Sequence, residues 1–183
     1  MMGHFRVAVI GILMIAFTPA AAWAAEAPEL SVRQTIVIDA PTDQVWEVVS
    51  DFAGLHKWFP FIADTRLVLG ENRRQGAIRE LRRTNGSKVE EKLVEYDPYN
   101  MSATYTYMGG KPLTSDYFST MTVTDAGGGK SQVEWKARFK RLHYWTDTPP
   151  EGKDDASLVK LLDKVYTVGL QSLKQYIETT PDK

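Results

Sequence analysis

The stretch AIRELRRTNGSKVEEKLVEY, residues 77–96, decides the fold class of this chain. Two segments of alternating apolar and polar residues, 77–83 and 88–96, flank the dipeptide Asn85-Gly86. An asparagine-glycine pair between alternating segments is the strongest short signal for a hairpin turn. The stretch therefore predicts an antiparallel hairpin, and with it a β-rich domain.

Two charges interrupt the apolar faces of this hairpin. Arg79 shares a face with apolar neighbours on the first strand, and Glu91 does so on the second. The hairpin brings the two strands together, and a lone buried charge is costly, so each side chain would need the other. The pair is a candidate polar anchor for a ligand head group. The alternatives are a structural ion pair and a pair exposed at the sheet edge.

Further segments of β-branched and alternating residues continue the sheet on both sides of the hairpin. In the last of these segments, apolar and charged residues alternate without a break, which predicts one covered face and one wet face. About seven antiparallel strands are expected in all. The segments are residues 32–38, 101–108, 115–124 and 132–142.

Helical patterns stand at both ends of this run of strands. Pro41 and Asp43 suit the first turn of a helix after the first strand. A second short helix is expected over residues 52–58, where Pro60 ends it.

The C-terminal segment predicts a long helix over residues 154–178. Its apolar residues recur at helical spacing, with Leu161 inside the apolar stripe and Tyr166 at its border. At 1.5 Å per residue this helix is about 37 Å long, which is enough to lie across a whole sheet.

The first 24 residues have the parts of a cleavable secretory leader. An apolar run covers residues 7–17, and Ala22-Trp23-Ala24 fits the small-x-small cleavage rule. A membrane-spanning helix needs about 20 residues, so the run is short for an anchor. We expect cleavage after Ala24, export to the periplasm, and one domain over residues 25–183. A retained N-terminal anchor is the alternative.

Composition argues against several classes of function. The chain has no cysteine, and only His56 and His143 remain after the leader, so thiolate and histidine-rich metal sites are excluded. The formal net charge is −1 and becomes −2 when the leader is removed. Such a charge argues against nucleic-acid binding and against anionic membranes. We expect no metal, no cofactor and no membrane span after the leader.

The order of elements and several motifs resemble the START-like, polyketide cyclase/dehydrase (SRPBCC) superfamily. The resemblance implies an α+β helix-grip fold, in which a curved antiparallel sheet grips a long C-terminal helix. The matching motifs are IDAPTDQVWEVVSDF (38–52), GAIRELRRTNGSKVEEKLVEYD (76–97), MSATYTY (101–107) and QVEWKARF (132–139).

A narrower resemblance is to MxaD-type periplasmic proteins, which are found with methanol-oxidation systems. It implies a non-catalytic accessory function, in which the protein assists the interaction of methanol dehydrogenase with its cytochrome c acceptor. Related chains often carry Trp-His-Pro where this chain has Trp58-Phe59-Pro60, so a proton-transfer role of that histidine would be lost here. The motifs behind this resemblance are DFAGLHKWFP (51–60), SDYFSTMTV (115–123), PPEGKDDA (149–156) and GLQSLKQYI (169–177).

A helix-grip fold leaves a cavity between sheet and helix, and strand alternation indicates which side chains face it. One interpretation is an aromatic pocket whose hydroxyls orient a small apolar ligand, which would make the protein a carrier or sensor. The other is an ordinary filled core. The candidates are Trp58 and Phe59, expected at the mouth, together with Arg79, Glu91, Tyr105, Tyr107, Tyr117, Trp135 and Phe139.

The sequence carries no recognisable catalytic motif. It has no nucleophile elbow, no zinc-protease motif and no phosphate-binding loop, so no catalytic residue is assigned. His56 is expected on a surface helix without a carboxylate to orient it. A cyclase or dehydratase would have only Arg79, Glu91 and the tyrosines as acid or base, and it ranks last.

One loop carries a further candidate surface. His143, Tyr144 and Trp145 form an aromatic cluster after the last strand. Such a cluster suits contact with another protein. The alternative is that it folds back over the mouth of the cavity.

Overall fold

The computed structural model describes residues 28–142 and 148–179. The predicted leader, with its cleavage site, and the cluster of His143, Tyr144 and Trp145 lie outside these residues.

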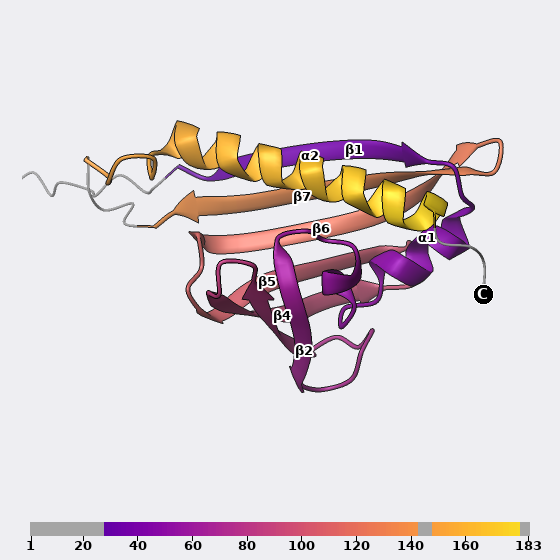
Figure 1. Ribbon diagram of the computed structural model, residues 1–183, viewed down its shortest axis with the longest axis horizontal. Helices are drawn as coiled ribbons and strands as arrows, with labels where there is room; N and C mark the ends of the chain where they lie inside the picture. Colours follow the sequence, from indigo (N-terminus) through magenta and orange to yellow (C-terminus); the bar gives the residue numbers. More distant parts are fainter. Residues whose placement is uncertain (1–27, 143–147, 180–183) are drawn as a thin grey trace, which may run out of the picture.

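Seven strands form one antiparallel sheet in the order β1-β7-β6-β5-β4-β3-β2. A long C-terminal helix, α2, lies lengthwise along β1 and β7 (Figure 1). The predicted helix-grip fold is therefore confirmed. The strands are β1 (Leu30–Ile38), β2 (Ile62–Leu69), β3 (Ile78–Arg83), β4 (Lys88–Asp97), β5 (Ser102–Gly110), β6 (Thr114–Gly127) and β7 (Lys130–Arg141).

The predicted hairpin is formed by β3 and β4. Arg83 N–H donates to the carbonyl of Ser87, and Gly86 N–H donates to the carbonyl of Arg83. Gly86 has a φ of 81°, which glycine adopts without the steric cost of a Cβ. The side-chain oxygen of Asn85 accepts from Ser87 N–H at 3.0 Å. Asparagine and glycine thus close the turn by different means, one through its side chain and one through its backbone.

Strand β2 (Ile62–Leu69) was not assigned from the sequence. It is an edge strand, paired only with β3, and its register shifts twice, between Ile62 and Asp64 and between Leu67 and Leu69. Each shift breaks the alternation of faces. Within β2 only Ile62 and Thr65 are buried, so the strand has no regular apolar pattern.

Two short segments connect β1 to β2. The first is helix α1 (Thr42–Val49), which buries Val45 and Trp46, and the Trp46 ring stacks on Tyr96. The second short helix, expected over residues 52–58, is shorter than predicted, because only the 3₁₀ helix η1 (Leu55–Lys57) forms there. Gly54 N–H closes a turn onto Asp51 before η1 begins, which leaves too few residues for an α-helix.

Helix α2 (Asp155–Thr179) begins beside Asp154, whose carboxylate accepts from Ser157 N–H at 2.9 Å. Its buried face differs from the predicted one, most clearly at Leu161 and Tyr166. Leu161 is 39% exposed, whereas Tyr166 is fully buried in the middle of the stripe. The correct stripe is Leu158, Leu162, Tyr166, Gly169, Leu170, Leu173 and Ile177. Within the described residues, no helix has the length and apolar character needed to span a membrane.

Candidate ligand cavity

A cavity of about 570 Å³ lies between the sheet and the N-terminal half of α2. This volume is within the usual range for small-molecule sites, about 300–1,000 Å³. The β3–β4 hairpin, the β5–β6 connection and the start of β2 complete its walls. The lining is Leu55, Phe59, Phe61, Ile62, Arg79, Leu81, Arg83, Thr84, Asn85, Ser87, Glu91, Tyr105, Tyr107, Lys111, Pro112, Leu113, Tyr117, Trp135, Leu161, Leu162, Lys164, Val165 and Tyr166.

Seven of the nine residues predicted from the sequence line this cavity, and two do not. Phe139 is fully buried in the packed core. Trp58 is 5% exposed, with its ring centroid 6.0 Å from that of Trp135, and its carbonyl accepts from the Ser172 hydroxyl at 2.6 Å. These contacts hold Trp58 behind the cavity wall.

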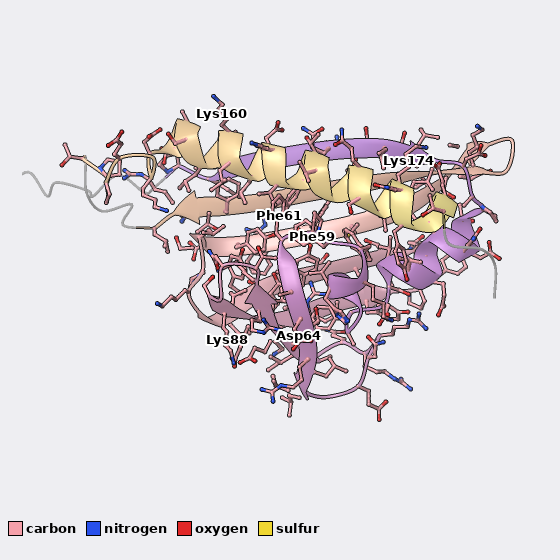
Figure 2. All side chains as sticks on the ribbon, in the orientation of Figure 1. Phe59, Phe61, Asp64, Lys88, Lys160 and Lys174 are labelled. Carbon is pink, nitrogen blue, oxygen red and sulfur yellow. The ribbon has the colours of Figure 1, made fainter. Side chains whose placement is uncertain are left out.

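The aromatic residue at the mouth is Phe61, not Phe59 as predicted. Phe61 is 37% exposed, whereas Phe59 is 8% exposed and packs against the Trp135 ring at 5.4 Å. The two phenylalanines lie together beside α2, with ring centroids 5.5 Å apart (Figure 2). Phe59 is therefore part of the inner wall, and Phe61 lies at the edge of the opening.

Arg79 and Glu91 meet, as the hairpin register predicted. Arg79 Nε and Nη2 donate to the same oxygen, Glu91 Oε2, at 2.9 and 2.6 Å. The third guanidinium nitrogen donates to the carbonyl of Phe52 at 2.8 Å, and the guanidinium lies over the Phe52 ring. The pair is buried, with Arg79 3% and Glu91 4% exposed. The alternative of an edge-exposed pair is therefore wrong.

The other carboxylate oxygen of Glu91, Oε1, is not bonded to Arg79. Glu91 Oε1 accepts no hydrogen bond from any described residue, although Glu91 lines the cavity. It offers an acceptor to a molecule that enters the cavity.

A chain of hydroxyls joins the sheet to α2 behind the cavity. The Tyr166 hydroxyl shares hydrogen bonds with Tyr117 at 2.7 Å and Ser119 at 2.8 Å. Trp135 Nε1–H donates to both Ser119 Oγ and Tyr105 Oη, each at 2.9 Å. The Trp135 and Tyr166 rings stack at 4.2 Å. The sequence signal for Tyr166 was its spacing of four residues from both Leu162 and Leu170.

The tyrosines of this region keep their protons at neutral pH. Burial raises the pKa of Tyr105 and of Tyr107, and the negative charge of Glu91 raises both further. Burial likewise raises the pKa of Tyr117 and Tyr166 well above the ordinary value. These hydroxyls are therefore suited to donating or accepting hydrogen bonds, and they are poor general bases.

A larger hollow, of about 850 Å³, lies on the outer face of the sheet. Several of its polar side chains bond to one another or to neighbours: the Thr104 and Thr120 hydroxyls are 2.9 Å apart, and Lys136 pairs with Glu134. Arg138 lies over the Phe118 ring. This hollow is the wet face predicted from the alternation of the last strand.

Among the described residues, no histidine lines the cavity. His56 is exposed, as expected, and does not line it. In residues 28–142 and 148–179, no group of three or more His, Cys, Asp or Glu side chains is arranged to hold a metal ion.

Known proteins of this architecture include receptors and enzymes. The chain is 25% identical over 146 residues to the abscisic acid receptor PYL6 of Arabidopsis thaliana, across 78% of this chain and 66% of the receptor. It thus spans slightly less than two thirds of that relative.

Two solved structures show the same fold at lower identity. XoxI from Bacillus cereus superposes with a TM-score of 0.70 at 24% identity, over 82% of this chain and 96% of XoxI. The Zhui aromatase/cyclase from Streptomyces sp. R1128 superposes with a TM-score of 0.66 at 20% identity, over 82% and 94% of the two chains.

The family is shown by a match along nearly the whole described chain. The model of the family described as polyketide cyclase / dehydrase and lipid transport matches residues 29–178, which include all seven strands and every residue of the cavity. The chain belongs to the polyketide cyclase / dehydrase and lipid transport family.

Proposed function

We propose that this protein binds a small, largely apolar ligand in the cavity between the sheet and α2. The observation that carries the proposal is the cavity itself, about 570 Å³ with aromatic walls and few polar groups. Apolar walls supply binding energy, and a few fixed polar groups orient the ligand. One relative is named as an abscisic acid receptor, which supports ligand binding in this fold.

Binding accounts for the cavity better than catalysis does. Arg79 already makes three hydrogen bonds to Glu91 and Phe52, so its guanidinium is committed to the protein. Burial raises the pKa of the cavity tyrosines, which removes them as bases at neutral pH. A cyclase activity remains the second possibility for the family, because one structural relative is named as an aromatase/cyclase.

The test is saturable binding of a neutral apolar fluorophore, N-phenyl-1-naphthylamine, to the purified protein. We expect one site per chain. Val165 lines the cavity, so Val165→Trp should obstruct it and weaken binding. Thr167 lies on the same helix but bonds to the Asp163 carbonyl instead, so Thr167→Trp is the matched control and should bind normally. Equal binding by both variants would place the fluorophore elsewhere and refute the proposal.

We place this function in the periplasm because of the leader-like first 24 residues. The supporting measurement is N-terminal sequencing of protein recovered from a periplasmic extract. A mature chain that starts at Ala25 is expected. A chain that keeps Met1 and sediments with membranes would favour the retained anchor.

A second candidate is an accessory function in methanol oxidation, favoured by the MxaD-like motifs. One fold neighbour bears the name XoxI, but at 24% identity it supports only the fold. Under this proposal, adding the purified protein should speed reduction of cytochrome c by methanol dehydrogenase. Reduction of an artificial acceptor by the dehydrogenase alone should stay unchanged. No effect on cytochrome reduction would remove this candidate and leave ligand binding in place.

A further inference from the structure

The mouth of the cavity carries positive charge that its lining does not balance. Arg79 and Glu91 neutralise each other, which leaves Arg83, Lys111 and Lys164. None of these three forms an ion pair with any residue that the structure describes.

This local charge contrasts with the rest of the molecule. The whole chain has a formal net charge of −1. Cations elsewhere on the surface are commonly paired, as Arg33 is with Glu134 and Arg66 with Glu80. An excess of three cations around one opening is therefore a feature of the opening, and not of the overall composition.

The three cations come from three different elements and converge on one rim. Arg83 ends β3, and its Nη1 donates to the carbonyl of Lys111 at 2.9 Å, which ties the hairpin to the β5–β6 connection. Lys164 reaches the same cavity from α2. Exposed apolar side chains, Phe61 and Leu161, stand beside them. The rim thus combines cations with apolar surface.

The inner wall has no such excess of positive charge. Glu91 faces the cavity with an oxygen that accepts no hydrogen bond from the described residues, and Arg79 is bonded to the other oxygen. An anionic group that entered this far would meet a carboxylate. A ligand with one charged end is therefore oriented with that end outward.

We propose that the ligand is an amphiphilic anion, with its apolar body in the cavity and its carboxylate or phosphate held at the mouth by Arg83, Lys111 and Lys164. This inference rests on the proposed ligand site. Exposed ion pairs are individually weak, so three together correspond to a preference of about threefold or more for an anion over a neutral analogue. The preference should shrink as salt is added.

The experiment compares four probes of one chain length: dodecanoate, dodecyl phosphate, dodecanol and methyl dodecanoate. At low salt, one or both anions should bind about threefold or more tightly than the two neutral probes. The better of the two anions identifies the head group. The double variant Lys111→Gln/Lys164→Gln should lose most of this preference while it still binds dodecanol.

The matched control is Lys160→Gln, one turn before Lys164 on α2. Lys160 does not line the cavity, and its side chain points away from the sheet (Figure 2). It should keep the full preference for the anions. Equal affinity for charged and neutral probes, or an equal loss in Lys160→Gln, would overturn the inference and leave the ligand site standing. Binding of none of the four probes would overturn the ligand site as well.

Discussion

At the scale of single residues, the buried Arg79–Glu91 pair is the clearest exception to apolar packing in the interior. Both side chains lie where an apolar residue would normally pack, and both are nearly fully buried. Burying a pair of charges costs several kcal/mol of desolvation per ion, which mutual attraction and good hydrogen bonds offset. Removing one partner leaves the other buried and uncompensated.

We therefore predict that Arg79→Met destabilises the protein by about 3–5 kcal/mol. The double variant Arg79→Met/Glu91→Leu should be more stable than Arg79→Met alone, because it leaves no unpaired charge. Urea denaturation measures both free energies of unfolding. Arg66→Met is the control, since its pair with Glu80 is exposed and such pairs contribute at most about 1 kcal/mol. A loss of stability in Arg79→Met no larger than that in Arg66→Met would contradict this account.

The same region shows how much of the cavity can be predicted from the sequence. Alternation along β3 and β4 was enough to predict that Arg79 and Glu91 meet, because hairpin register fixes which side chains are opposite. Alternation was not enough to separate Phe139 from Trp135, which share one face of β7. Whether a residue on that face lines a cavity or fills the core depends on where α2 lies above it. That position is a tertiary property, and no strand pattern encodes it.

At the scale of elements, one close contact joins α2 to the segment after η1. Gly169 is buried on α2, and a Cβ built there would lie 2.6 Å from the Phe59 ring and 2.7 Å from the Trp135 ring. Glycine inside a helix costs up to about 1 kcal/mol relative to alanine. Glycine fits here because any larger side chain would collide with these two aromatic rings.

We predict that Gly169→Ala destabilises the protein by about 1–3 kcal/mol, because the rings must move to make room for the new methyl group. This loss outweighs the higher helix propensity of alanine. Gln171→Ala, at an exposed position of the same helix, should change stability little. Thermal and urea unfolding of both variants make the comparison. A Gly169→Ala protein as stable as the wild type would mean that the helix shifts without penalty.

This contact also bears on the resemblance to MxaD-type proteins. Phe59 belongs to the motif DFAGLHKWFP and Gly169 to GLQSLKQYI, so two of the motifs behind that resemblance pack against each other. Ser172 of the second motif also bonds to the Trp58 carbonyl of the first. Shared packing is a sufficient physical reason for these motifs. These motifs therefore support the fold, and the methanol-oxidation proposal depends on the functional test.

At the scale of the whole molecule, the hydroxyl chain couples the sheet to α2. Tyr105 comes from β5, Tyr117 from β6 and Tyr166 from α2, and Trp135 of β7 joins them. Burial raises the pKa of each tyrosine in the folded state, whereas unfolding exposes them to water. Their ionisation is therefore linked to unfolding.

The sign of the resulting pH dependence follows from whether the folded or the unfolded chain keeps the tyrosine protons. Below pH 10, the ordinary pKa of tyrosine, these hydroxyls are protonated in both states and stability is unaffected. Above it, the unfolded chain loses protons that the folded chain keeps, so stability falls by up to about 1.4 kcal/mol per pH unit for each tyrosine. We predict a steep loss of unfolding free energy above pH 10, measured by urea titrations. Tyr166→Phe should reduce the slope, whereas Tyr99→Phe, at a side chain 92% exposed, should not. An unchanged slope in Tyr166→Phe would show that the buried hydroxyls are not what ties α2 to the sheet.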